Sequence, residues 1–176
     1  MTRKRLAFAL SAALLAASGY IGLGSLIAGA RADDLQSTID TRRATMKDIA
    51  AQMKAIYAVV DAKSGDMADM QKRALQVKGD IGKAATLFPA GTSTDDFPGK
   101  THALPAIWKD MDSFKADAAN LQTQADKLAA AAQGGDMAAF AAQFAATGKA
   151  CGTCHTDFRA KLNLSLIHIS EPTRRS

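Results

Sequence analysis

Residues 39–60 read IDTRRATMKDIAAQMKAIYAVV. Large apolar side chains recur every seven residues along this stretch, at Ile39, Met46, Met53 and Val60. Two isoleucines, Ile49 and Ile56, fall between them and complete one continuous apolar face. This spacing predicts an amphipathic helix over residues 35–62 that buries one side against other helices.

Three further amphipathic helices are predicted after this one. Asp66 follows a Ser-Gly break and should cap a helix that runs to about residue 87. Pro105 suits the first turn of a third helix, and a Gly-Gly pair at residues 134–135 ends it. Asp136 should cap a fourth helix that runs to about residue 162. Trp108 is expected in the core near the start of the third helix.

The segment between the second and third helices, residues 88–104, is predicted to be a loop. It contains two prolines and two glycines, at Pro89, Gly91, Pro98 and Gly99. Its length is unusual for a compact bundle, and long loops often have a function. No segment alternates with a period of two. The sequence therefore predicts an all-α protein, a left-handed antiparallel (up-down) four-helix bundle.

Charge is unevenly distributed along the chain of 176 residues, which has 22 Lys and Arg against 17 Asp and Glu. Six of the basic residues and one acidic residue lie in residues 1–32 and 164–176, which leaves residues 33–163 with 16 of each sign. A neutral domain lacks the basic face that nucleic-acid binding needs, so we expect no nucleic-acid partner.

The N-terminal segment has the order of a secretory signal peptide. A basic start at Arg3, Lys4 and Arg5 is followed by an apolar run, and residues 30–32 (ARA) offer small residues to a peptidase. The apolar run is longer than most, so an uncleaved membrane anchor is the alternative. In both cases we expect the domain of residues 33–163 to be exported to the periplasm.

Residues 164–176 read LSLIHISEPTRRS, which resembles the translation of a sequencing adapter. Their apolar residues are also out of register with the preceding helix. We expect a non-native tail, with a genuine frayed tail as the alternative, and assign no role to His168.

Residues 151–155 read CGTCH, the C-x-x-C-H attachment signature of c-type haem. In such sites two thiols add across the haem vinyl groups and an imidazole coordinates iron. On a helix, Cys151, Cys154 and His155 share one face.

The same predicted helical face carries more apolar residues: Phe140, Phe144, Gly148, Phe158 and Leu162. A glycine costs about 1 kcal/mol inside a helix, so Gly148 needs a reason to be there. We predict that these residues form a wall against which a flat macrocycle lies.

Three other interpretations of the two cysteines stay open at this point. A redox-active C-x-x-C of the thioredoxin type should begin a helix after a strand, and this motif lies late in a helix. A structural disulfide suits an exported protein but leaves His155 without a role. A zinc site needs a fourth ligand, for which the domain offers His102 in the loop, more simply explained as a solvated residue.

The chain resembles the class II cytochromes c, the cytochrome c′ family, whose members are exported four-helix bundles with C-x-x-C-H near the C-terminus. The resemblance covers about residues 35–163. It rests on TRRATMK (41–47), LFPAGT (87–92), ALPAIW (103–108) and ATGKACGTCHTDFRAK (146–161).

The resemblance implies one covalent haem c, with thioether bonds from Cys151 and Cys154 and with His155 as the proximal iron ligand. Arg159, one turn after His155, matches the basic residue beside the proximal side. Arg42 matches the arginine near a haem propionate, and its alternative is a side chain that extends to water. Met46 matches the position that faces the sixth site of iron. There it either binds through sulfur or fills space and leaves iron five-coordinate.

Three functions follow as hypotheses. The first is a one-electron carrier that exchanges electrons with redox partner proteins, with Met46 as sixth ligand. The second is a five-coordinate, high-spin cytochrome that binds NO or CO. The third is a haem-free disulfide or metal-binding bundle. We expect no enzyme, because no nucleophile–base pair or carboxylate dyad is recognisable, and the resemblance implies a homodimer through the first two helices.

Overall fold

The computed structural model describes residues 21–161. The chain divides into two units, Met1–Asp34 and Leu35–Ser176, and the helical bundle belongs to the second. Most of the predicted signal peptide and the predicted non-native tail lie outside the described residues. Within residues 21–161, no helix combines the length and the hydropathy that crossing a membrane requires.

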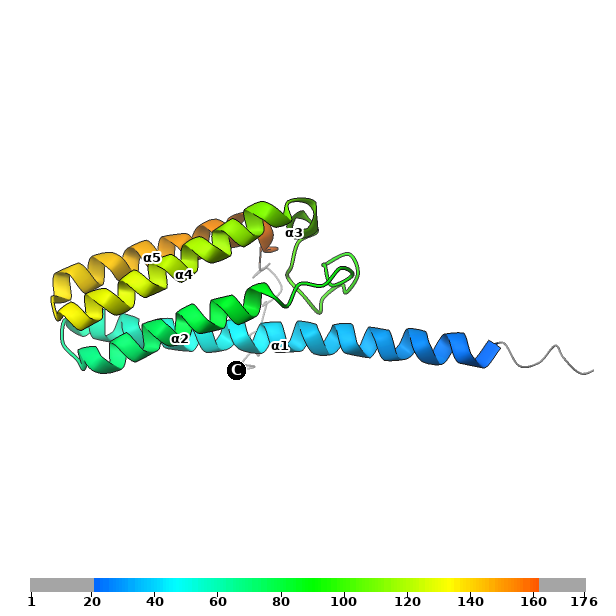
Figure 1. Cartoon of the computed structure of the whole chain (residues 1–176), viewed down its shortest axis with the longest axis horizontal. Helices are drawn as coiled ribbons and strands as arrows, with labels where there is room; N and C mark the ends of the chain where they lie inside the picture. The colour runs from blue at the N-terminus through cyan, green and yellow to red at the C-terminus, as the bar shows by residue number, and fades with distance from the viewer. Residues whose placement is uncertain (1–20, 162–176) are drawn as a thin grey trace, which may run out of the picture. The chain divides into compact units, whose positions relative to one another are not determined.

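The described residues form five helices: α1 (Ile21–Ala62), α2 (Met67–Ala85), α3 (Ala106–Lys109), α4 (Met111–Gly134) and α5 (Met137–Phe158). The four long ones run antiparallel to their neighbours in the chain, with α1 beside α2 and α4 beside α5 (Figure 1). The predicted all-α, four-helix bundle is confirmed.

Two helix starts follow the sequence prediction because each has an aspartate cap. The Asp66 carboxylate accepts hydrogen bonds from the amides of Ala68 and Asp69 at 2.8 and 3.2 Å. Asp136 accepts from the two equivalent amides of α5 at 2.8 and 3.3 Å. Each cap satisfies amides that the first turn leaves without a partner.

The predicted third helix is divided in two. Asp110 has non-helical backbone angles (φ −138°, ψ 64°) and caps α4 through a hydrogen bond from the Ser113 amide. The short helix α3 therefore stands apart after Pro105. The predicted packing of Trp108 is confirmed, since it is half-buried against a core cluster and its indole donates to the Phe88 carbonyl at 3.2 Å.

The last helix is shorter than predicted and ends at Phe158, not near residue 162. The chain is extended at Arg159, which forms an antiparallel bridge with Ala103 of the long loop. The Leu104 amide donates to the Phe158 carbonyl at 3.0 Å, and the Ala160 amide donates to the His102 carbonyl at 2.8 Å. Pairing with the loop thus replaces the expected last turn, and Leu162 lies outside the described residues.

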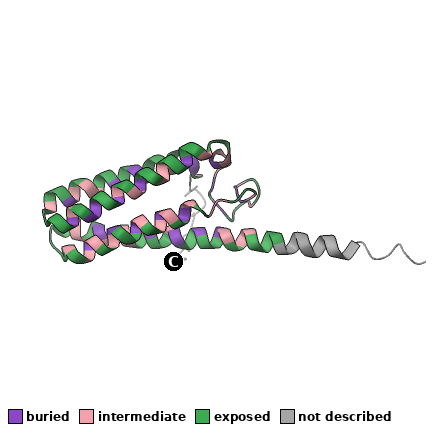
Figure 2. Ribbon diagram, viewed as in Figure 1, coloured by how far each residue is buried: buried purple, intermediate pink, exposed green. Residues whose placement is uncertain are grey.

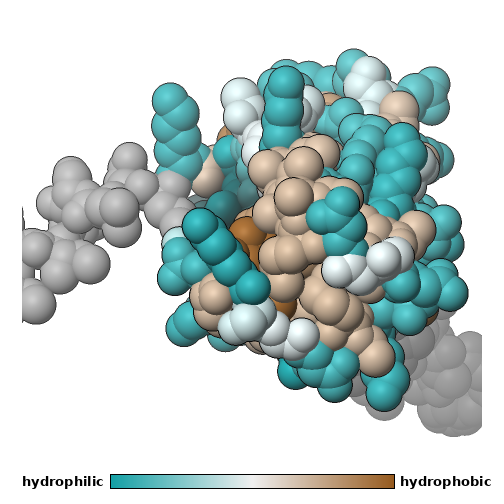
Figure 3. All heavy atoms as spheres, turned by 90° about the vertical axis from the view of Figure 1, so that its left-hand side faces the viewer, coloured by the Kyte–Doolittle hydropathy of each residue, from teal (hydrophilic) through white to brown (hydrophobic). Residues whose placement is uncertain are grey.

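Buried residues lie mainly on the inward faces of the helices (Figure 2). At the end where α1 passes into α2, the core cluster includes Ile56, Leu128 and Phe140, each 0% exposed. Viewed end-on, that end shows hydrophobic residues gathered at its centre and ringed by hydrophilic ones (Figure 3). The opposite end of the bundle carries the loop between α2 and α3 (Figure 1).

Candidate functional site

A cavity of about 660 Å³ opens into the bundle at the end that carries the long loop. Its volume lies within the range typical of cofactor and small-molecule sites. Four long helices, α3 and the loop all contribute to its wall. The wall is largely apolar and includes Met46, Ile49, Met53, Ile81, Ala84, Phe88, Ala103, Ile107, Phe114, Leu121 and Phe158.

All of the site residues predicted from the sequence line this one cavity. They come from α1, from the last turns of α5 and from the residue directly after it: Arg42, Met46, Cys151, Cys154, His155 and Arg159. More than a hundred residues separate the two groups along the chain. The bundle is therefore what brings them together.

The two cysteines are free thiols on the last turns of α5. Burial, with smaller contributions from Asp117, Cys151 and Asp157, raises the pKa of Cys154 to about 11. Burial also raises the pKa of Cys151. A redox-active C-x-x-C needs the opposite, a thiolate stabilised by its surroundings, so the thioredoxin-type interpretation does not fit.

The imidazole of His155 faces the cavity beside Arg159. Burial, and secondly the charge of Arg159, lowers the pKa of His155. The neutral imidazole is thereby favoured, and this is the form that binds a metal ion. The prediction that Arg159 continues the helix is wrong, because the bridge to Ala103 extends its backbone. Its side chain still lines the cavity, and its amide donates to the His155 carbonyl at 3.2 Å.

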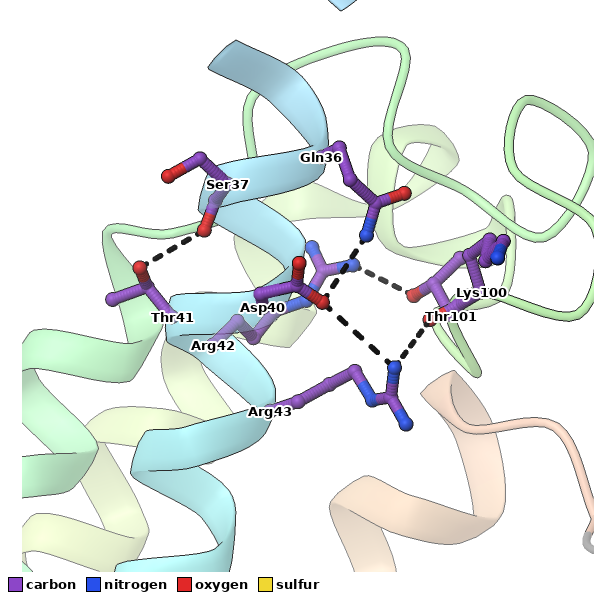
Figure 4. A network of polar contacts seen from close by, with 8 residues as sticks. All are labelled: Gln36, Ser37, Asp40, Thr41, Arg42, Arg43, Lys100 and Thr101. Atoms are coloured by element: carbon purple, nitrogen blue, oxygen red, sulfur yellow. Dashed lines mark hydrogen bonds and ion pairs between the residues drawn. The ribbon is translucent and has the colours of Figure 1, made fainter. Parts of the chain in front are cut away.

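Arg42 does not extend to water, as the alternative had it, but is buried with 4% exposure. Its Nη1 donates to the Leu87 carbonyl and to Thr92 Oγ1, at 3.1 and 3.2 Å. Its Nη2 donates to the Thr92 carbonyl and to Thr101 Oγ1, at 3.1 and 2.7 Å. Figure 4 shows its guanidinium directed from α1 at the loop. The guanidinium carbon also lies 4.3 Å from the centre of the Phe88 ring.

Every acceptor in these contacts is neutral, so the positive charge of Arg42 is not balanced by a carboxylate there. Burial lowers the pKa of Arg42 to about 10, which leaves it charged at neutral pH. A buried cation is costly unless it is paired. An anionic group of a ligand in the cavity suits this place.

Comparison with known proteins identifies the family. The sequence model of the family described as cytochrome c′ matches residues 37–159. The chain belongs to the cytochrome c′ family. It is 37% identical over 124 residues to cytochrome c-556 of Agrobacterium tumefaciens strain B2A, covering 70% of this chain and 97% of the relative. It is 34% identical over 134 residues to cytochrome c′ of Rhodospirillum rubrum, covering 74% and 87%.

Solved structures of the family share the fold. Cytochrome c′ of Thermochromatium tepidum has a TM-score of 0.65 and 30% identity, with 72% of this chain and 97% of that chain covered. A nitric oxide complex of a mutant cytochrome c prime from Alcaligenes xylosoxidans has a TM-score of 0.64 and 27% identity, with the same coverage. The cofactor of this family is covalent haem c, and this cytochrome has the two thiols, the imidazole and the cavity to hold it.

The haem-free alternatives are therefore set aside. Cys151 and Cys154 form no disulfide in this structure. Within residues 21–161, no three His, Cys, Asp or Glu side chains cluster as a metal site would require. His102 is exposed, as predicted, although it also lines the edge of the cavity.

Gly148 fits the predicted haem wall. A Cβ atom added there would meet no atom within 4 Å, and the residue lines the cavity. Two phenylalanines of the predicted wall lie elsewhere: Phe140 is in the core at the other end of the bundle, and Phe144 packs against that cluster. Phe144 also lies 6.2 Å, between ring centres, from Tyr57.

Met46 of this cytochrome is half-buried on α1 and lines the cavity. It packs against a core cluster that includes Ile49, Ile81 and Leu121. One space thus holds a thioether from α1 and an imidazole from α5. Met53 lines the same cavity two turns further along α1.

Three charged residues of the wall were missed by sequence reasoning: Arg43, Lys47 and Asp117. Asp117 could have been found, because it interrupts the apolar stripe between Phe114 and Leu121. Arg43 and Lys47 gave no such signal, since exposed charges on a helix are ordinary.

Proposed function

We propose that this protein is an exported one-electron carrier with one haem c. Cys151 and Cys154 attach the haem, His155 is the proximal ligand and Met46 is the sixth ligand. The observation that carries this proposal is the presence of the Met46 thioether and the His155 imidazole in one largely apolar cavity.

The haem, when bound, supplies a one-electron couple between ferrous and ferric iron. A thioether is a soft, neutral ligand that favours the ferrous state and raises the reduction potential. The apolar wall keeps water away from the site. Arg42 would balance the charge of a haem propionate, and Arg159 would disfavour imidazolate character at His155.

Visible spectroscopy of holoprotein, matured with the haem-attachment machinery, tests the ligation. We expect low-spin bands at neutral pH, and high-spin bands in the Met46→Leu variant. Met53→Leu is the matched control, because Met53 lines the same cavity on the same helix, and it should stay low-spin. High-spin bands in the unmodified protein would exclude Met46 as a ligand.

A second function, binding of NO or CO at five-coordinate iron, is favoured by one observation. A relative of the same fold was solved as a nitric oxide complex. In this alternative Met46 fills space beside the sixth site. Titration of the ferrous protein with CO distinguishes the two, since a ligated thioether must first be displaced and so weakens CO binding.

Export and assembly complete the proposal. Residues 1–32 would be removed as a signal peptide, so the mature periplasmic protein should begin at Asp33, which N-terminal sequencing checks.

The protein would exchange electrons with redox partner proteins and catalyse no reaction of its own. It would form a homodimer through α1 and α2, which light scattering of the purified holoprotein measures.

A further inference from the structure

The wall of the cavity carries positive charge although the domain is neutral. Four lining side chains are cationic (Arg42, Arg43, Lys47 and Arg159) and one, Asp117, is anionic. Residues 33–161 as a whole have 16 basic and 16 acidic residues. The excess at the cavity is therefore local.

Three of these cations lie where the cavity meets solvent. Arg43 and Lys47 are exposed and one turn apart on α1, and Arg159 is exposed directly after α5. We refer to Arg43, Lys47 and Arg159 as the basic rim. Arg43 also donates to the Lys100 carbonyl at 3.3 Å, which keeps it beside the loop (Figure 4). Its ion pair with Asp40 is long, at 3.8 Å, and both side chains are at least half exposed.

The negative charges of the haem propionates do not cancel the positive charge of the basic rim. Haem c has two propionates, and the buried Arg42 is placed to balance one of them. The second propionate and Asp117 then face three exposed cations of the rim. Counted over the side chains that line the cavity, one positive charge remains at its opening. Asp40, which pairs with Arg43 at 3.8 Å, lies outside this lining.

We propose that the basic rim is the docking surface for an acidic electron-transfer protein, one that carries carboxylates around its own redox centre. The inference rests on the proposed electron-transfer function. Exposed charges of one sign around an opening steer an oppositely charged partner and raise its association rate. Salt screens that attraction, and at 0.1 M ionic strength exposed charges more than about 10 Å apart hardly interact.

Stopped-flow oxidation of the reduced holoprotein by two small oxidants tests the charge of the opening. With anionic ferricyanide, we expect the rate constant to fall as ionic strength rises. With cationic tris(phenanthroline)cobalt(III), we expect it to rise. Because the domain is formally neutral, the sign of the salt dependence reports the charge near the haem edge and not the net charge of the protein.

Oxidised plastocyanin of an acidic type is the protein probe. The double variant Arg43→Gln/Lys47→Gln should lower its rate at low ionic strength by about three- to tenfold and leave the rate at high ionic strength unchanged. The matched control is Lys63→Gln/Lys127→Gln, which removes the same charge from exposed residues outside the cavity wall. Circular dichroism and haem content confirm that each variant is folded.

Two results would overturn the inference while leaving the proposed function intact. One is an equal loss of rate in the rim variant and the control. The other is a ferricyanide rate that does not fall with salt. Failure of the proposed function itself looks different, because a five-coordinate haem would show high-spin bands before any oxidant is added, and a haem-free protein would show no haem bands at all.

Discussion

Thr101 accepts a hydrogen bond of 2.7 Å from Nη2 of Arg42, a residue that precedes it by 59 positions. Nη1 of the same guanidinium binds the Leu87 carbonyl at 3.1 Å. One buried cation on α1 thus holds both ends of the long loop. Phe88, Thr101 and Ala103 of this loop line the cavity. Arg42 therefore holds part of the cavity wall in place and also adds a positive charge to it.

Replacing Arg42 by lysine should therefore cost stability as well as charge balance. A single ammonium cannot reach four acceptors that a planar guanidinium binds from two nitrogens. We expect Arg42→Lys to lower the free energy of unfolding by about 2–4 kcal/mol, because buried acceptors lose their partner. Arg43→Lys, an exposed neighbour, should stay within about 0.5 kcal/mol. Denaturant unfolding measures both, and equal costs would contradict this role of Arg42.

Gly148 should be needed for haem and not for folding. A Cβ atom at this position would meet no protein atom within 4 Å, so the fold tolerates a side chain there. That side chain would enter the cavity and occupy space that the haem needs. We expect Gly148→Leu to keep the helical content and to lower the haem-to-protein ratio. Gly79→Leu is the control, since a Cβ at Gly79 also meets nothing within 4 Å and Gly79 does not line the cavity. A haem content that falls equally in both variants would refute this explanation.

Two helix starts were predictable from the sequence because their cause is local. Asp66 and Asp136 cap amides two and three residues away. The end of α5 was not predictable in this way. It depends on a bridge between Arg159 and Ala103, which lie 56 residues apart and pair only once the bundle has formed.

The candidate site likewise has features that the sequence predicts and features that depend on the packed bundle. The C-x-x-C-H motif and the resemblance to the family select Cys151, His155 and Met46 as site residues, and all three line one cavity. The apolar stripe of α5 misled at Phe140, because one helical face serves the core at one end and the cavity at the other. Periodicity identifies a buried face but does not show where along it packing gives way to a cavity.

The contribution of Asp96 to the stability of the long loop should depend on pH. Ser93 donates to its Oδ2 from Oγ at 2.6 Å and from the backbone amide at 3.0 Å. The side-chain hydrogen bond first, and then the backbone one, holds the pKa of Asp96 below its usual value near 3.8. The ionised carboxylate therefore stabilises the fold above that value, and this contribution is lost as the pH falls through the lowered pKa. In Ser93→Ala the NMR titration of the Asp96 carboxyl should shift to higher pH, whereas an unchanged titration would show that Ser93 has no such effect.

Asp117 should tune the reduction potential. It projects from α4 into the cavity wall, and its charge contributes to the raised pKa of Cys154, so its field reaches the haem attachment site. A negative charge stabilises ferric iron, which carries one more positive charge than ferrous iron. We expect Asp117→Asn to raise the potential by on the order of tens of millivolts, since the group is only partly screened by water. Asp61→Asn removes the same charge from an exposed residue of α1 outside the cavity wall and should change the potential far less. Spectroelectrochemical titration of both holoproteins measures the shift, and a fall in potential, or equal shifts in the two variants, would show that Asp117 does not act on the haem.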